Sequence, residues 1–282
     1  HLGGLQWVGQ WAQWQGLSDL VCAPAMAGVG LGLTVLTAQK APEQHAALWF
    51  GATGLGWLCT APLWMIAWFF PEAVASALRL GPEAQHWVGK VALSGWTSIL
   101  WGMLSSYWLG RHQQGRVALL ALLTGTPQLL ALASAHGSPP EIGLQRVVLT
   151  SLFMGLVGVL AWLALWIRWV RHTPGAWTRM QQVLSPVASY LPAGFSVGLL
   201  TPLSVLIIRS HLAQHMDWDA AGIATALWRA SDWVLSGASG VLYFHYLPRL
   251  SLAAQHGRLQ LALGPMLKQV LGPCVLALIG LW

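Results

Sequence analysis

The chain has 282 residues, of which 56% are hydrophobic and only 8% are charged. Soluble globular domains carry about 25% charged residues, so this composition excludes an ordinary water-soluble domain and places the chain in a lipid bilayer. The 19 tryptophans agree with this interpretation, because indole rings favour the interface between membrane and water. The net charge of +6 is spread over few loops, which is typical of cytoplasmic loops of membrane proteins rather than of nucleic-acid binding.

Eight apolar segments are long enough to cross a hydrocarbon core of about 30 Å as α-helices. They are approximately Trp11–Ala38, Ala46–Phe70, Trp87–Leu109, Val117–Ala135, Gly143–Val170, Leu184–Arg209, Ala220–Leu247 and Leu261–Trp282. We therefore predict an all-α integral membrane protein, a polytopic helical bundle. The sixth segment is interrupted by Pro186, Pro192 and Pro202. Such breaks often lie near the substrate path of transporters, and a static kink explains them equally well.

Basic residues are distributed unequally between alternate loops. One set of loops, with the adjoining helix ends, contains nine of them: Lys40, Arg111, Arg116, Arg168, Arg171, Arg179, Arg249, Arg258 and Lys268. The opposite set contains four: Arg79, Lys90, Arg146 and Arg209. Cytoplasmic loops are enriched in lysine and arginine, so the first set is predicted to face the cytoplasm. The opposite side is predicted to carry a short interfacial helix within Pro71–Gly81.

The two ends of the sequence suggest a fragment, and its cysteines suggest no metal or disulfide chemistry. It begins at His1 with no basic segment before its first apolar run, and it ends at Trp282 inside another apolar run. We expect a fragment of a longer protein, with one more helix before His1 and several after Trp282. The three cysteines, Cys22, Cys59 and Cys274, lie in separate apolar segments and suggest neither a metal site nor a disulfide framework.

Motifs of enzyme chemistry are not found in the sequence. It contains no Walker A loop, no GxSxG, no HExxH and no CxxC. His211 and His215 have a spacing that suits a metal ion on one helix face. Their position beside Asp217 and Asp219 favours a solvated turn instead. The spacing of Trp7, Trp11 and Trp14 is typical of an aromatic helix face, with a sugar-stacking platform as the weaker alternative. We predict neither an enzyme nor a metal or cofactor site.

The stretch Leu184–Ser251 is the most informative part of the sequence. It consists of two long apolar segments joined by the polar turn His211–Asp219. The second segment carries Arg229 and Asp232 near its middle, where an isolated charge costs at least about 2.5–3.5 kcal/mol. A membrane protein retains such residues when they face a partner, a polar cavity or a substrate. Because the two are three residues apart on one helix face, a mutual ion pair is the simplest structural explanation.

Four further charged residues form the informative set together with Arg229 and Asp232: Asp19, Lys90, Arg146 and Arg209. Lys90 and Arg146 lie near outer helix ends and Arg209 closes the sixth segment, so all three cations can extend to the membrane surface. The functional alternative is a cavity lined by four cations and two carboxylates. Its excess positive charge attracts an anionic headgroup such as a lipid-linked pyrophosphate, because the guanidinium fork matches phosphate.

Three short motifs follow one another in this stretch: Asp217-Trp-Asp-Ala-Ala-Gly-Ile223, then Ser231-Asp232, then Tyr246-Leu-Pro-Arg-Leu-Ser251, with Arg209 before them. In sequence and in the offset of Arg209 they resemble the motifs of the lipid-linked polysaccharide repeat-unit flippases of the MOP exporter superfamily, the O-antigen and common-antigen (lipid III) translocases. The resemblance covers about 65 residues. The sequence departs from the family pattern at Ala224 and Thr225, where Trp-Gln is expected, and at Arg229, where a small polar residue is usual.

The resemblance implies a fold of two six-helix lobes around a central cavity, with alternating access. Residues 1–180 correspond to the N-terminal lobe without its first helix, and 181–282 to the start of the C-terminal lobe, about eight of about twelve helices. The resemblance further implies an undecaprenyl-pyrophosphate-linked oligosaccharide as the cargo, the bacterial inner membrane as the location, and polysaccharide polymerase or assembly proteins as expected partners. We expect Arg209, Arg229, Arg146 and Lys90 to bind pyrophosphate, and Asp232 and Asp19 to orient the arginines or couple an ion.

Three alternatives stay open at this point. A drug or cation antiporter of the same superfold requires a cavity dominated by carboxylates, of which this chain has few. A lipid II flippase for peptidoglycan precursors keeps the mechanism and changes the cargo. A non-transporting membrane scaffold in a glycan-assembly complex requires no alternating access.

Overall fold

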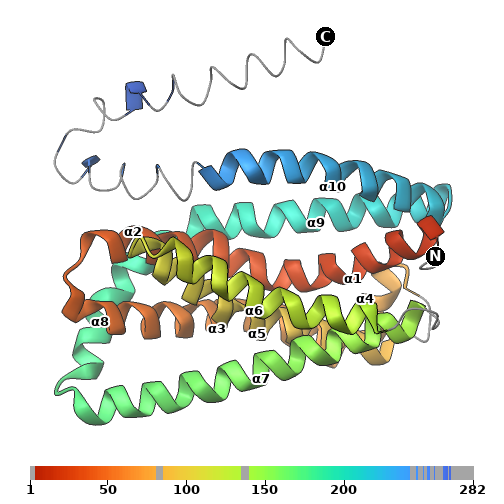
Figure 1. Cartoon of the computed structure of the whole chain (residues 1–282). Coiled ribbons are helices and arrows are strands. Elements are labelled where there is room, and N and C mark those ends of the chain that lie inside the picture. The colour runs from red at the N-terminus through yellow and green to blue at the C-terminus, as the bar shows by residue number, and fades with distance from the viewer. Residues whose placement is uncertain are drawn as a thin grey trace.

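The computed structural model describes residues 4–80, 85–134 and 140–241, together with residues 246, 250, 253–254, 257, 263–265 and 267. The described part of the chain is helical and contains no strand, as the composition predicts. The long helices run roughly parallel in one bundle, and the short helix α8 lies at one end of it (Figure 1).

The helices follow each other with short connections. Their bounds are α1 Gly4–Ala25, α2 Leu31–Gln39, α3 His45–Phe69, α4 Pro71–Ala77, α5 Gln85–Gly110, α6 Gln114–Ala133, α7 Pro140–His172, α8 Ala176–Ala188, α9 Leu191–His215 and α10 Trp218–Val241. A π-helical turn, Met26–Gly30, joins α1 to α2, and a 3-10 turn, Pro42–Gln44, precedes α3. The short helix predicted after Pro71 is present as α4, and its position at the membrane interface stays a prediction. The eighth predicted segment lies largely outside the described residues.

The prediction for the sixth segment, Leu184–Arg209, is wrong at both ends. The chain first forms α8, turns at Ser189 and Tyr190, and then begins α9 at Leu191 with Pro192 in its first turn. Proline is accepted there because its missing N–H has no partner in the first turn of a helix. Helix α9 then continues to His215, so that Arg209 lies inside the helix and not at its end. The apolar composition runs across the turn without interruption, which is why hydrophobicity alone does not reveal it.

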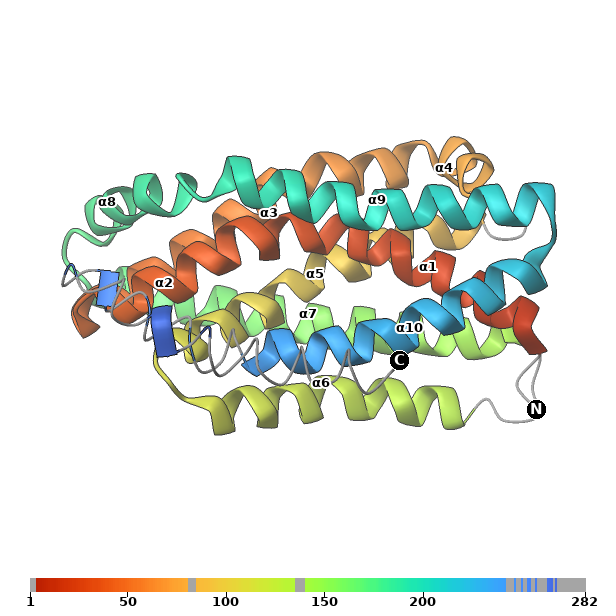
Figure 2. The same cartoon turned by 90° about the horizontal axis from the view of Figure 1, so that it is seen from above.

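Helix α1 occupies the middle of the bundle. Helices α9 and α10 pack side by side along one side of it, and α3 and α5 pack along the other, while α6 and α7 lie beyond α5 (Figures 1 and 2). Close approach of α9 to the π-helical turn requires glycine. A Cβ atom at Gly194 would lie 2.2 Å from the Cα atom of Gly28, and one at Gly198 would lie 2.5 Å from the carbonyl oxygen of Ala23. Helix α1 therefore contacts both groups of helices directly.

Five described segments are long and apolar enough to cross a membrane: Val8–Gln39, Pro42–Phe69, Gln114–Ala133, Ile142–His172 and Leu191–His215. Helices α5 and α10, which the sequence also predicts to span, are less apolar. Much of α5 packs against protein, and buried hydroxyls such as those of Ser94 and Thr97 donate to carbonyls of their own helix. The outer faces of α6, α7 and α9 expose many large apolar side chains, among them Leu122, Phe153 and Leu200. These faces suit contact with lipid.

The two ends of the bundle differ in charge. The connections α2–α3, α5–α6 and α7–α8 lie at one end, and the connections α3–α5 and α9–α10 lie at the other (Figure 1). The first end carries Lys40, Arg111, Arg116, Arg168, Arg171 and Arg179, with Glu43 as its acidic residue among those described. The second end carries Arg79 together with the acidic residues Glu72, Asp217 and Asp219. The described members of the predicted cytoplasmic set thus gather at one end; Arg249, Arg258 and Lys268 lie outside the described residues.

Candidate functional site: a charged cavity beside α1

A cavity of about 430 Å³ lies between α1, α9 and α10. Four charged side chains line it: Asp19, Arg209, Arg229 and Asp232. We call it the charged cavity. The rest of its lining is small or apolar and includes Ala12, Gly16 and Gly198. Four of the six candidate residues predicted from the sequence therefore meet in one place, although they lie on three helices and up to 213 positions apart in the chain.

Arg209 is buried in the wall of this cavity. Its Nη1 atom donates a hydrogen bond of 2.7 Å to the carbonyl oxygen of Ala12 on α1, and only 8% of the residue is exposed. The expectation that Arg209 closes a helix and extends outward is therefore wrong, because α9 continues for six residues beyond it. Gly16 makes room for this contact: a Cβ atom there would lie 3.4 Å from Nη1 of Arg209 and 2.7 Å from Cδ2 of Leu206.

Arg229 approaches α1 from α10. Its Nη2 atom donates a hydrogen bond to the side-chain amide oxygen of Gln15. The ion pair predicted between Arg229 and Asp232 is not formed, and within the described part of the chain neither guanidinium of the cavity is paired with a carboxylate. Arg229 therefore has a neutral hydrogen-bond partner, while the carboxylates of Asp19 and Asp232 lie in the same cavity without forming a direct ion pair with it.

Asp19 is exposed although it lies well inside the first predicted span. The reason is that it lines two cavities. Besides the charged cavity it borders a second one of about 260 Å³ on the opposite side of α1, among α1, α5, α6 and α7. We call this the polar cavity. Its polar lining consists of Gln15, Ser18, Asp19, Ser94, Ser98, Gln128 and Ser151.

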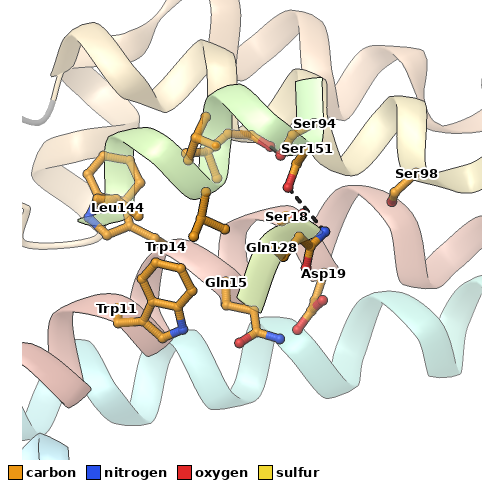
Figure 3. Close-up of a pocket in the computed structure, with 13 residues that line it drawn as sticks. Trp11, Trp14, Gln15, Ser18, Asp19, Ser94, Ser98, Gln128, Leu144 and Ser151 are labelled. Carbon is orange, nitrogen blue, oxygen red and sulfur yellow. Dashed lines mark hydrogen bonds between the residues drawn. The ribbon is translucent and has the colours of Figure 1, made fainter. Parts of the chain in front are cut away.

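The polar cavity contains a single charged group among its described lining residues, Asp19. Figure 3 shows Gln15 and Asp19 pointing in the same direction from α1, with Trp11 and Trp14 toward one end of the cavity. Gln128 on α6 donates a hydrogen bond of 3.1 Å to the hydroxyl of Ser151 on α7. Gln15 and Asp19 thus connect the polar cavity to the charged cavity across α1.

Lys90 and Arg146 line neither cavity. The ammonium of Lys90 lies 4.2 Å from the ring centroid of Trp87, one turn earlier in α5. Arg146 is exposed and donates hydrogen bonds to the carbonyl and hydroxyl oxygens of Ser134 at the end of α6. The charged cavity therefore holds two arginines and two aspartates, and the predicted excess of two positive charges is not found there.

Two glutamines of α1 were missed by the sequence reasoning. Gln13 is completely buried and donates from Nε2 to the carbonyl oxygens of Leu78 and Leu206, both at 3.3 Å, and to the hydroxyl of Ser210 at 2.7 Å. Gln15 holds Arg229. Both are neutral, so a search for charges passes over them. The available signal was an amide side chain inside an apolar segment, since such groups join helices within membranes.

The motif that opens α10 has a local structural role. The carboxylate of Asp217 accepts a hydrogen bond of 2.6 Å from the backbone N–H of Ala220, which is the geometry of an N-cap. Asp219 lies in the first turn, where a negative charge interacts favourably with the helix dipole. His211 and His215 lie on the last turns of α9 with ring centroids 4.2 Å apart. Most of the third motif, Tyr246–Ser251, lies outside the described residues.

No family model, curated protein or solved structure matches this chain. The chemistry of the charged cavity must therefore carry the functional inference. It offers two guanidiniums that form no ion pair with a described carboxylate, two carboxylates, and a hydrogen-bonded link to the polar cavity through Gln15. These groups can bind an ionic ligand and exchange protons. The cavity lies inside a bundle whose outer helix faces are apolar and suited to a membrane.

Proposed function

We propose that this chain belongs to a multi-pass inner-membrane flippase that moves an undecaprenyl-pyrophosphate-linked oligosaccharide for the synthesis of cell-surface polysaccharide. The observation that carries the proposal is the charged cavity, in which Arg209 and Arg229 meet without a carboxylate partner. Diphosphate is a ligand that two neighbouring guanidiniums recognise well, because each fork donates parallel hydrogen bonds. The resemblance of Asp217–Ile223 to the flippase motif points to the same cargo.

The position of the cavity suits alternating access. One wall comes from α1, in the proposed N-terminal lobe 1–180, and the other from α9 and α10, in the proposed C-terminal lobe 181–282. The two walls pack closely through small residues such as Gly16 and Gly198, and at the cavity they are also joined by two polar contacts, Arg209 with Ala12 and Arg229 with Gln15. When the lobes rock, these hydrogen bonds exchange with hydrogen bonds to the diphosphate, so that opening the cavity exposes no unpaired buried donor.

The charge balance of the cavity favours one competitor, a cation or drug antiporter of the same superfold. Two carboxylates, those of Asp19 and Asp232, line the cavity together with two arginines. These carboxylates attract a cationic ligand. Asp19 is exposed to both cavities and is the group best placed to exchange a proton. This alternative predicts that the aspartates, and not the arginines, determine ligand affinity.

The deciding experiment is transport in proteoliposomes by the full-length protein. A labelled polyprenyl-pyrophosphate glycan is the test cargo, and lipid II and a cationic dye are the comparison cargoes. We expect glycan transport to be lost in Arg209→Ala and Arg229→Ala and retained in Arg116→Ala, an exposed arginine far from the cavity. Transport of the dye with loss in Asp19→Asn and Asp232→Asn would establish the antiporter instead, and preference for lipid II would change the cargo.

A further inference from the structure

A third cavity, of about 740 Å³, lies between α3, α5 and α7 at the end of the bundle that collects the basic residues. It shares no lining residue with the charged cavity or the polar cavity. Five aromatic side chains form much of its wall: Trp49, Phe50, Tyr107, Trp108 and Trp169. We call it the aromatic groove.

The aromatic wall is packed into a fixed arrangement. Phe50 is 5% exposed and stacks on Trp169 with ring centroids 5.2 Å apart. Trp49 lies 4.8 Å from Phe50 and 6.4 Å from Tyr107 between ring centroids. Such contacts are at the separations that aromatic pairs prefer, so the groove is formed before any ligand arrives. An apolar chain entering the groove therefore contacts an ordered apolar surface.

The groove has a cationic mouth. Arg168 and His172, on the last turns of α7, line it together with Thr173. Arg168 is exposed, and within the described residues its guanidinium has no hydrogen-bond or ion-pair partner. Tyr107 is oriented by Arg111, whose Nη1 atom donates to the phenol oxygen at 3.1 Å. The opening of the groove thus presents the positive charge of Arg168 and hydrogen-bond donors next to its aromatic wall.

The level of the mouth along the bundle matches that of a lipid headgroup. Helix α7 has 33 residues, a length of about 50 Å, and so extends beyond a hydrocarbon core of about 30 Å. Arg168 lies in its last two turns, near the basic connections α2–α3 and α5–α6. The apolar side chain of Leu165, 50% exposed, lies one turn further into the bundle and lines the same groove. Along the bundle, the apolar wall of the groove is therefore followed by the cationic Arg168, in the same order as the acyl chain and the phosphate of a phospholipid.

We propose that the aromatic groove is a binding site for an anionic phospholipid, with an acyl chain against Trp49, Phe50 and Trp169 and the phosphodiester on Arg168. Basic pockets between membrane helices on the cytoplasmic side are suited to anionic headgroups. The exposed guanidinium supplies the selectivity, since a zwitterionic lipid brings its own cation to the same place. This site is separate from the charged cavity and does not depend on the transported cargo.

Native mass spectrometry of the full-length protein in detergent tests the site. Phosphatidylglycerol and phosphatidylcholine with the same acyl chains are added at equal concentration, and the number of retained lipids is compared. We expect one phosphatidylglycerol to be retained preferentially. Arg168→Gln should reduce its retention about ten-fold through loss of a charge-assisted hydrogen bond, and Arg168→Lys should reduce it less. Arg116→Gln, an exposed arginine at the same end outside the groove, should leave it unchanged.

Three results would overturn the proposal. Equal retention of the two lipids by the wild-type protein shows ordinary annular lipid, and this comparison requires no variant to fold. Equal effects of Arg168→Gln and Arg116→Gln show diffuse attraction to the basic end. Displacement of phosphatidylglycerol by inorganic phosphate at similar concentrations shows an anion site without a role for the groove. Unchanged thermal unfolding of each variant confirms that retention is compared between folded proteins.

Discussion

The guanidinium of Arg209 on α9 donates a hydrogen bond of 2.7 Å to the backbone carbonyl oxygen of Ala12 on α1. A carbonyl oxygen has two lone pairs, so it can accept this bond in addition to the bond of its own helix. Of the five donors of the guanidinium, most remain available for a ligand in the charged cavity. Arg209 thus joins the two walls of the cavity and also faces its interior.

Replacing Arg209 tests its role in binding the ligand. Arg209→Ala should weaken binding of inorganic pyrophosphate to the purified protein by about 10–100-fold, the equivalent of about 1.5–3 kcal/mol for hydrogen bonds to a charged group. Arg209→Lys keeps the charge and loses the fork, so its affinity should lie between the two. Isothermal titration calorimetry measures the affinity. Pyrophosphate affinity equal to that of the wild type in Arg209→Ala would exclude this residue from the site.

The contact between Arg229 and Gln15 should couple α10 to α1. Gln15→Leu and Arg229→Leu, singly and together, form a double-mutant cycle whose coupling free energy should be about 0.5–3 kcal/mol for residues in direct contact. Thermal unfolding in one detergent provides the stabilities. Gln15→Leu with Arg116→Leu serves as the unlinked control and should be additive. Additivity in the Gln15–Arg229 cycle as well would mean that the hydrogen bond does not join the helices.

Close approach of α9 to the π-helical turn makes Gly194 sensitive to substitution. Gly194→Ala places a Cβ atom against the backbone of Gly28 and should destabilise the protein by about 1–3 kcal/mol or more, as in other overpacked cores. Gly54 lies inside α3 with no atom within 4 Å of its Cβ position, so Gly54→Ala should be neutral or stabilise by up to about 1 kcal/mol. Thermal unfolding distinguishes the two; equal effects would contradict the packing described.

Asp217 should stabilise the start of α10 as an N-cap. Asp217→Ala removes the acceptor for the Ala220 N–H and should cost about 1 kcal/mol, whereas Asp217→Asn keeps an acceptor and should cost little. Hydrogen exchange of the first turn of α10 provides a local measurement, and exchange there should accelerate only in the alanine variant. Faster exchange in both variants would indicate a role for the negative charge rather than for the cap.

Lys90 and Arg146 provide the test of which cations matter. Both lie outside the charged cavity, so glycan transport by Lys90→Ala and Arg146→Ala should stay near that of the wild type, in contrast to Arg209→Ala and Arg229→Ala. The proteoliposome assay compares all four at equal protein content. Loss of transport in Arg146→Ala, with unchanged thermal unfolding, would show that the cargo also contacts the N-terminal end of α7.

The elements that the sequence predicts well are those with a strong, uninterrupted pattern. Gly143–Val170 reads as one long apolar run and forms most of α7. The sixth segment was predicted less well because its hydrophobicity continues across Ser189 and Tyr190, where the direction of the chain changes. Hydrophobicity measures the free energy of transferring a side chain into an apolar environment and contains no information on chain direction. The available signal for the break was Pro192, because the residue before a proline is disfavoured in a helical conformation.

Composition by itself determined that the chain is helical and suited to a membrane, because each charge in an apolar segment carries a large free-energy cost and the segments contain few charges. For the same reason it singled out Asp19, Arg229 and Asp232. Only the tertiary structure decided that these meet Arg209 while Lys90 and Arg146 do not, since this depends on how closely α9 packs on α1 at Gly16 and on the π-helical turn at Gly28. The same packing brings the neutral Gln15 into contact with Arg229, and this contact between α1 and α10 cannot be predicted from either helix alone.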